Sequence, residues 1–270
     1  MMIFDMMVDK KQDMMMSIFR MILFIMALSF FGFVQAENVL YLRDNLKRAN
    51  KGDYIVTAQN KNYTLFHIYD KEDNKMTIEE ITVPMSRFPR NMGSWKQWIS
   101  LRAPGNTSWV MYALNLNTAQ MLEFYSLSKN AWYDTTKTDN FLTTLLNLRL
   151  KEIPWNDRKK VGFPTLPGMT DHRPLWQPRM VVDGQEIQGV FFNAWTTRWP
   201  EDGTDLTGKT IEVYVPELND KYPSYFPYWL QISGMIGKAK IRIIDSGSKM
   251  DSPAAPLGSH RSQVINKRTN

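Results

Sequence analysis

Few side chains in this sequence could perform catalysis. The chain contains three histidines and no cysteine, so a cysteine nucleophile is excluded. His172 lies in a Pro-rich stretch directly after Asp171, and the two could serve as the base and the orienting carboxylate of a serine hydrolase. The Gly-x-Ser-x-Gly sequence that presents the serine in many such enzymes is absent. We therefore favour a solvated loop histidine and keep the hydrolase as the alternative.

Carboxylate pairs and metal ligands give no stronger signal. Glu79 and Glu80 are adjacent in an expected strand, so they point to opposite faces and cannot flank one glycosidic bond. Asp183 and Glu186 are a second formal pair, for which solvated turn charges are the simpler interpretation. The histidines are scattered, without the i, i+4 spacing of zinc proteases. The sequence therefore predicts neither a metal site nor a cofactor.

Aromatic residues are the one enrichment that suggests binding. They make up 13% of the chain, with nine Trp, which is a high content. Large aromatic side chains either fill a core or line a groove for an apolar chain, a sugar ring or a peptide. Core packing is the simpler use. The residues predicted to line such a groove are Phe191, Trp195, Trp199, Tyr228 and Trp229, accompanied by Tyr222, Tyr225 and Phe226.

The charge distribution argues against a nucleic-acid partner. The net charge is +6, but part of the excess lies in the C-terminal residues Lys249, Arg261, Lys267 and Arg268. The remaining body has no concentrated basic stripe of the kind that nucleic-acid binding requires.

The N-terminal segment resembles an export signal. Arg20 precedes an uncharged apolar run of thirteen residues, 21–33, and Val34-Gln35-Ala36 places small residues where a signal peptidase cleaves. The run is shorter than the ~20 residues of a membrane-spanning helix, so no permanent anchor is expected. The sequence predicts a cleavable signal over 1–36, translation from Met1 or from Met14, Met15 or Met16, and an exported protein, periplasmic or secreted.

Hydrophobic spacing in the first half predicts short helices and antiparallel strands. A helix is expected over 38–50, ended by Gly52, with others over 93–101 and from Asp139 or Asn140 to Leu148. Alternation and turn residues predict strands over 54–59, 63–69, 76–83, 110–116 and 121–127.

The second half is expected to be richer in strands. Five prolines make 154–178 a long irregular loop. Strands are expected over 180–182, 186–198, 211–215, 226–232 and 239–243. The fold class predicted is mainly β (α+β), an antiparallel sheet, half-barrel or sandwich with a few short covering helices. One domain is expected over 37–248, followed by a disordered basic tail over 249–270.

Four stretches resemble uncharacterised exported proteins of the chlamydiae. They are Leu40-Tyr41-Leu42-Arg43, 52–57 (GDYIVT), Phe226-Pro227-Tyr228-Trp229 and 241–247 (IRIIDSG). The resemblance implies no activity. The expected layout is also similar to the half-barrel of periplasmic lipoprotein carriers, an analogy of architecture alone.

The sequence thus favours a non-catalytic exported binding or envelope-assembly protein. Its expected partner is an apolar ligand, a glycan or an envelope protein, presented to the aromatic groove. An exported hydrolase acting through His172 is the alternative.

Overall fold

The protein folds around one strongly curved antiparallel sheet. The computed structural model describes residues 38–135, 141–166, 168–234 and 237–260. Within them, residues from Val39 onward form a compact unit of their own. The mainly β class predicted from the sequence is confirmed.

Twelve of the described strands pair in the order β1-β8-β11-β12-β13-β14-β2-β3-β4-β5-β6-β7, and every pairing is antiparallel. The sheet is open, with β1 and β7 as its edges. Its strands are β1 (Val39–Leu40), β2 (Tyr54–Gln59), β3 (Asn62–Lys71), β4 (Lys75–Pro84), β5 (Ser108–Asn115), β6 (Met121–Ser126), β7 (Ala131–Tyr133), β8 (Leu150–Glu152), β11 (Phe192–Arg198), β12 (Thr210–Pro216), β13 (Trp229–Gly234) and β14 (Gly237–Gly247).

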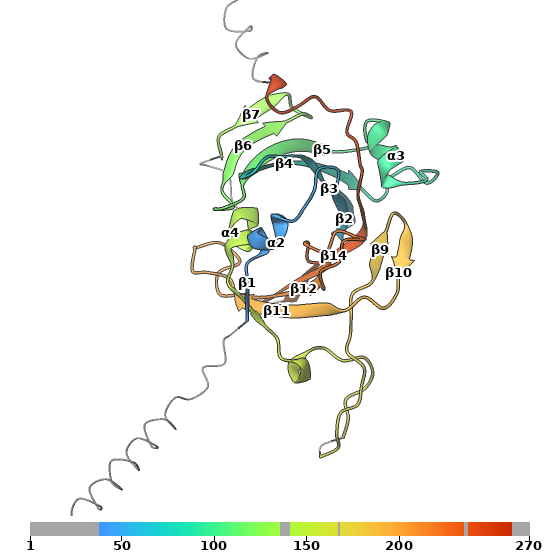
Figure 1. Cartoon of the computed structure of the whole chain (residues 1–270), viewed down its shortest axis with the longest axis vertical. Helices are drawn as coiled ribbons and strands as arrows, with labels where there is room; N and C mark the ends of the chain where they lie inside the picture. The colour runs from blue at the N-terminus through green and yellow to red at the C-terminus, as the bar shows by residue number, and fades with distance from the viewer. Residues whose placement is uncertain (1–37, 136–140, 167, 235–236, 261–270) are drawn as a thin grey trace, which may run out of the picture. The chain divides into compact units, whose positions relative to one another are not determined.

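Short helices lie on both faces of this sheet. Helices α2 (Leu42–Leu46) and α4 (Phe141–Asn147) lie inside the curve, whereas α3 (Trp95–Ser100) and the separate hairpin of β9 (Met180–Val182) and β10 (Gln185–Ile187) lie outside it (Figure 1). One 3-10 turn, η2 (Trp155–Asp157), opens the Pro-rich connection.

The largest core fills the concave face. Leu42 and Leu46 of α2 and Leu145 and Leu146 of α4 pack there against strand residues such as Ile78. A second core lies under α3, where Trp98 and Ile99 are fully buried. The sheet is therefore covered by apolar contacts on both faces, which its many buried strand residues require.

Two expectations about elements were wrong. The helix expected over 38–50 is reduced to α2, because Val39 and Leu40 instead pair with β8 as an edge strand. The single long arm expected over 186–198 is two strands, β10 and β11. Gly189, with φ of 74°, lets the chain turn between them, because glycine adopts this left-handed conformation without steric cost.

The ordered fold also extends past the predicted boundary at residue 248. Met250 and Leu257 are buried against the convex face, and the Tyr69 hydroxyl donates to the Ala254 carbonyl at 2.9 Å. Residues 249–260 are thus part of the domain and not of a disordered tail. The rest of that predicted tail and the predicted signal over 1–36 lie outside the described residues.

Candidate functional site: an apolar cavity inside the sheet

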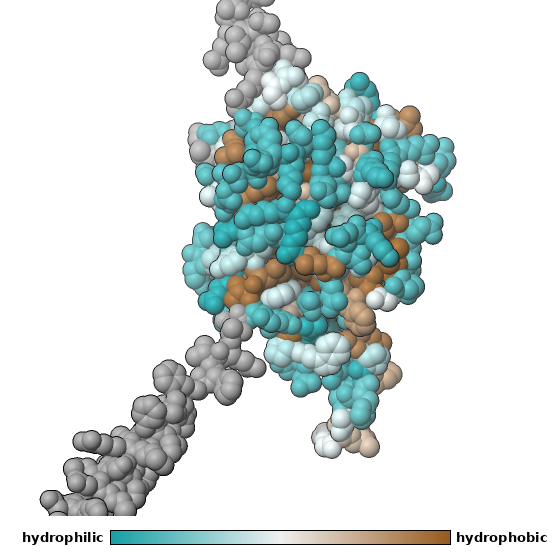
Figure 2. Space-filling view, in the orientation of Figure 1, coloured by the Kyte–Doolittle hydropathy of each residue, from teal (hydrophilic) through white to brown (hydrophobic). Residues whose placement is uncertain are grey.

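A cavity of about 350 Å³ lies between the two inner helices and the concave face of the sheet. The helices α2 and α4 and the strands β2, β3, β4, β5, β13 and β14 all contribute to its wall. Its lining residues are Leu42, Leu46, Ile55, Thr57, Gln59, Thr64, Phe66, Ile78, Glu80, Tyr112, Phe141, Leu142, Leu145, Leu146, Tyr225, Phe226, Pro227, Leu230 and Ile241. Figure 2 shows a band of hydrophobic surface between the positions of α2 and β12.

Strand periodicity explains why these residues share the cavity. Successive side chains of a strand alternate between faces, so Ile55, Thr57 and Gln59 of β2 all point inward. Ile78 and Glu80 of β4 do the same. The helices supply leucines at i, i+4 spacing, which places them on one side of each helix. The result is an apolar chamber with a few polar groups.

Among the described residues that line the chamber, Glu80 is the one carboxylate. The Tyr112 hydroxyl, on the neighbouring strand β5, donates to Glu80 Oε2 at 3.3 Å. Burial raises the pKa of Glu80, and the hydrogen bond from Tyr112 opposes that rise. Burial also raises the pKa of Tyr112 well above its usual range, and the nearby Glu80 adds to the effect. The cavity therefore offers a carboxyl and a hydroxyl pair to the polar end of an apolar ligand.

The preceding residue, Glu79, faces the opposite side of the sheet. Its carboxylate accepts hydrogen bonds from the Trp109 indole at 2.8 Å and from the Ser252 hydroxyl at 2.7 Å. It is fully buried and lies against His67. The predicted separation of Glu79 and Glu80 is confirmed, and the two carboxylates cannot act on one substrate.

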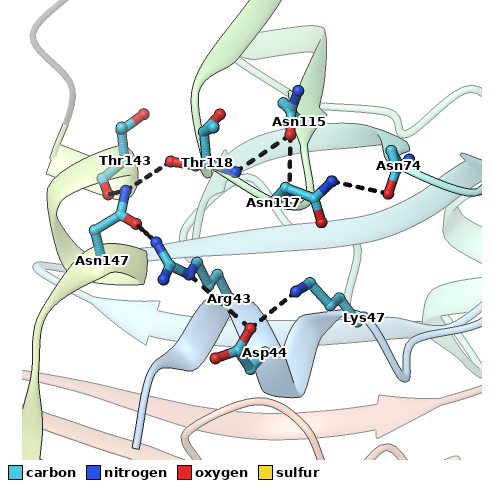
Figure 3. Close-up of polar contacts among 9 residues, drawn as sticks. All are labelled: Arg43, Asp44, Lys47, Asn74, Asn115, Asn117, Thr118, Thr143 and Asn147. Carbon is cyan, nitrogen blue, oxygen red and sulfur yellow. Dashed lines mark hydrogen bonds and ion pairs between the residues drawn. The ribbon is translucent and has the colours of Figure 1, made fainter.

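A polar layer joins the two inner helices to the strand turns beside the cavity (Figure 3). The Arg43 guanidinium of α2 donates to the Asn147 side chain of α4. The Asn147 amide donates in turn to the Thr118 carbonyl at 2.8 Å, in the turn between β5 and β6. Asn117 in that turn donates to Asn74 at 3.0 Å. The first two hydrogen bonds tie α4 to α2 and to the turn between β5 and β6, and the third ties that turn to the turn between β3 and β4.

The structure places the predicted groove aromatics in different surroundings. Trp195 and Trp199 pack in the concave core, and the Trp199 ring stacks on Phe141 with a centroid separation of 5.3 Å. Tyr228 and Trp229 belong to a separate core with Phe192. Phe191 is 61% exposed. None of the five lines the cavity, although Trp199 supports Phe141, which does.

Two members of the wider aromatic set, Tyr225 and Phe226, do line the cavity. The Tyr225 hydroxyl donates to Asp53 Oδ2 at 2.6 Å, which fixes the chain before β13. Most lining residues are leucines, isoleucines and threonines from the two inner helices and from strands that are distant in sequence. The sequence signals for this wall were the helical spacing of the leucines in α2 and α4 and the aromatic residues Tyr225 and Phe226.

In the predicted hydrolase pair, Asp171 is engaged in structural contacts. Asp171 accepts from the Arg173 guanidinium at 2.9 Å and lies 3.0 Å from Lys160 Nζ. These cations hold the pKa of Asp171 well below its usual range, with Arg173 the larger cause. His172 is exposed on the same loop. The geometry therefore shows an ion-paired loop stem around Asp171.

The second formal pair is engaged as well. Asp183 accepts from the Tyr54 hydroxyl at 2.9 Å and pairs with Lys96 at 2.7 Å. Glu186 pairs with Arg179, whose guanidinium is the main cause that lowers the pKa of that carboxyl.

The described part of the chain contains no group of three or more His, Asp or Glu side chains arranged to hold a metal ion. No helix within it is long and apolar enough to cross a membrane.

Comparison with known proteins points to one group. A comparison with curated proteins found no match. The fold is similar to the solved structure of the hypothetical protein CT021 from Chlamydia trachomatis, with a TM-score of 0.57 and 19% sequence identity over 81% of this chain and 98% of that one. Residues 64–188, from β3 to the end of the β9–β10 region, match the model of the CT021 protein family. The resemblance to uncharacterised chlamydial proteins that the sequence suggested is thereby confirmed.

Proposed function

We propose that this protein is a non-catalytic binding protein that holds an apolar ligand in the cavity under α2 and α4. The observation that carries the proposal is the cavity itself, an apolar chamber with the Glu80–Tyr112 pair in its wall. Its volume of about 350 Å³ is in the range of small-molecule sites. The ligand expected has an apolar body and one polar group.

Two of the predicted aromatic residues, Trp195 and Trp199, pack in the core beside the cavity and do not line it. The Trp199 ring stacks on Phe141, which lines the cavity, and the Trp199 indole donates to Asp202 at 2.7 Å. This hydrogen bond fixes the Trp199 ring, which in turn positions Phe141. Trp195 packs in the same core. We assign Trp199 to the positioning of α4 and Trp195 to core packing, rather than either to ligand contact.

Export belongs to the same proposal. A protein that carries an apolar molecule between envelope layers needs an enclosed site, and the segment 1–36 has the order of regions typical of a signal peptide. N-terminal sequencing of protein from the native cell is expected to find Glu37 as the first residue. Protein that begins at Met1, Met14, Met15 or Met16 would contradict export by cleavage.

The binding test uses a fluorescent apolar probe such as N-phenylnaphthylamine, which brightens in a dry site. The native protein is expected to bind the probe. Leu142→Trp is expected to weaken binding at least tenfold, because the indole is larger than the leucine side chain and extends from α4 into the cavity. Leu142 is only half-buried, so the helix can accommodate the change. Leu122→Trp, at an exposed position on β6, is the matched control and is expected to bind as the native protein does.

Equal probe binding by the native protein and Leu142→Trp, with melting temperatures unchanged, would contradict the proposal that the ligand binds in this cavity. Mass spectrometry of material extracted from the native protein then identifies the natural ligand. Turnover of esters, peptides or glycosides that His172→Ala abolishes would instead establish the hydrolase alternative.

A further inference from the structure

The polar and apolar groups of the cavity lie on different parts of its wall. The lining residues of helices α2 and α4 and of strands β13 and β14 are all leucine, isoleucine or phenylalanine. Apart from Tyr225, whose hydroxyl is engaged with Asp53, the lining residues with polar side chains come from the neighbouring strands β2 to β5. They are Thr57, Gln59, Thr64, Glu80 and Tyr112. The chamber therefore has a polar strand wall and an apolar cover under the helices.

The charge of this wall limits the kind of ligand that it can hold. None of the described residues that line the chamber is a lysine, an arginine or a histidine. A fatty-acid carboxylate or a phosphate group would therefore lose its hydration beside Glu80 without gaining a counter-charge. Burial of a charge without a partner is strongly unfavourable, so the wall disfavours anionic ligands.

The strand wall offers hydrogen-bond acceptors to a ligand. The Tyr112 hydroxyl donates to Glu80 Oε2 at 3.3 Å, so its oxygen can still accept. Among the described residues, none donates to Glu80 Oε1. The Thr57 hydroxyl is engaged with the Thr64 carbonyl at 3.3 Å, and the Thr64 hydroxyl with that of Thr82 at 3.1 Å. The polar end of a ligand that meets Glu80 and Tyr112 must therefore be able to donate.

A hydroxyl matches these groups better than an ammonium does. An ammonium brings three N–H donors and a tightly held hydration shell, and the acceptors at Glu80 and Tyr112 are too few to replace that shell. A hydroxyl brings one donor and costs less to desolvate. Because a hydroxyl also accepts, it can pair with the Glu80 carboxyl in either of its protonation states.

We propose that the ligand is an uncharged amphiphile of the long-chain alcohol class, whose hydroxyl hydrogen-bonds to Glu80 and Tyr112 and whose alkyl body lies under α2 and α4. This inference rests on the proposed function, because it specifies the ligand of the same cavity. It excludes free fatty acids and lipids whose phosphate group would enter the chamber.

Displacement of N-phenylnaphthylamine from the native protein compares head groups directly. Decanol, decanoate and decylamine share one alkyl chain, and at pH 7 they are neutral, anionic and cationic, respectively. Each is added below the concentration at which it forms micelles or droplets. Decanol is expected to displace the probe at a concentration at least ~10-fold lower than either charged compound, because a charged head group must be buried without adequate partners.

Two variants of Glu80 test the contact itself. Glu80→Leu removes the acceptor and is expected to weaken decanol binding at least ~3-fold, while probe binding is retained. Glu80→Gln keeps an acceptor at the same place and is expected to bind decanol within about twofold of the native protein. Rescue by the amide distinguishes a hydrogen bond to the ligand from a change in packing. If Glu80→Leu does not fold, the comparison of the three compounds decides alone.

The outcomes separate this inference from the proposed function. If the probe binds and decanoate displaces it as well as decanol does, the head group is wrongly assigned and the cavity remains a binding site. Displacement that is best with decylamine would also overturn the inference, because Glu80 would then act as the counter-ion of a cation. Equal decanol binding by the native protein and both variants would contradict the contact with Glu80. Failure of the native protein to bind the probe would contradict the proposed function, and this inference with it.

Discussion

His67 and Glu79 lie opposite each other on β3 and β4, with His67 Nδ1 2.9 Å from Glu79 Oε2 and both side chains buried. The other ring nitrogen, Nε2, lies 2.9 Å from the Met250 carbonyl, which can only accept, so Nε2 must carry a proton. A second proton is shared between Nδ1 and the carboxylate, because two acceptors could not approach so closely. This pair fastens the C-terminal segment to the convex face.

Replacement of His67 is expected to be strongly destabilising. His67→Ala leaves the buried Glu79 carboxylate and the Met250 carbonyl without this partner, and loss of one member of a buried pair typically costs about 3–5 kcal/mol. Urea unfolding measures the change in free energy. The exposed His172→Ala is the control and is expected to stay within ~0.5 kcal/mol of the native protein. Equal stability of the two variants would contradict the inferred role of His67.

Truncation tests the same segment as a whole. A chain that ends at Ser248 loses the burial of Met250 and Leu257 and the hydrogen bonds that Ala254 and Ser252 make to the sheet. It is expected to melt several degrees lower than the native protein, because a 1 kcal/mol loss shifts Tm by roughly 2–4 °C in a domain of this size. A chain that ends at His260 retains these contacts and serves as the control. A Tm unaffected by either truncation would restore the tail predicted from the sequence.

The local pattern of the sequence predicted much of the fold. The meander of β2, β3 and β4 and the hairpin of β5 and β6 follow from alternation and short polar turns, and α3 and α4 follow from helical spacing. The order of strands in the sheet cannot be predicted from local sequence pattern, because β14, near the C-terminal end of the chain, pairs with β2, near its beginning. Residues 249–260 look like a tail because their burial depends on single residues, Met250 and Leu257, that dock on distant strands.

The site was predictable only in part. The aromatic count drew attention to Trp195 and Trp199, yet the cavity next to them is lined mainly by aliphatic residues. Aliphatic residues do not indicate a binding site in a sequence, because they also make up ordinary hydrophobic cores. Glu80 becomes informative only once its strand register is known, because register decides which of two adjacent glutamates faces the chamber.

Replacement of each of the two tryptophans of the concave core is expected to distinguish a role in core packing from a role in ligand binding. Trp199 is 3% exposed, and truncation of a core Trp to Ala typically costs about 3–5 kcal/mol. Trp199→Ala is therefore expected to unfold at clearly lower urea concentration and to weaken probe binding through Phe141. Trp195 is only partly buried, and Trp195→Ala is expected to lose less stability and to retain the probe. Loss of the probe in Trp195→Ala with stability unchanged would move the ligand to the aromatic groove first predicted.

The pH dependence of stability should identify Glu80 as a carboxyl whose pKa burial raises. Because burial raises its pKa in the folded state, its protonated form is the one that folding favours. Its contribution to stability is then complete below the unfolded pKa of ~4.3 and is lost as pH rises through the higher folded pKa. Glu80→Gln is neutral at every pH and keeps an acceptor for the Tyr112 hydroxyl.

The free energy of unfolding of Glu80→Gln minus that of the native protein is thus expected to be near zero at pH 4 and to increase toward pH 8. Each unit by which the folded pKa exceeds the unfolded one adds about 1.4 kcal/mol to the final difference. Glu186→Gln is the control of opposite sign, since Arg179 lowers the pKa of that exposed carboxyl and its small contribution is lost as pH falls. Urea unfolding of the three proteins between pH 4 and pH 8 measures both differences. A Glu80→Gln difference that stays flat across this range would show that the cavity solvates the ionised carboxylate, and the chamber would then suit a cationic or strongly polar ligand better than an apolar one.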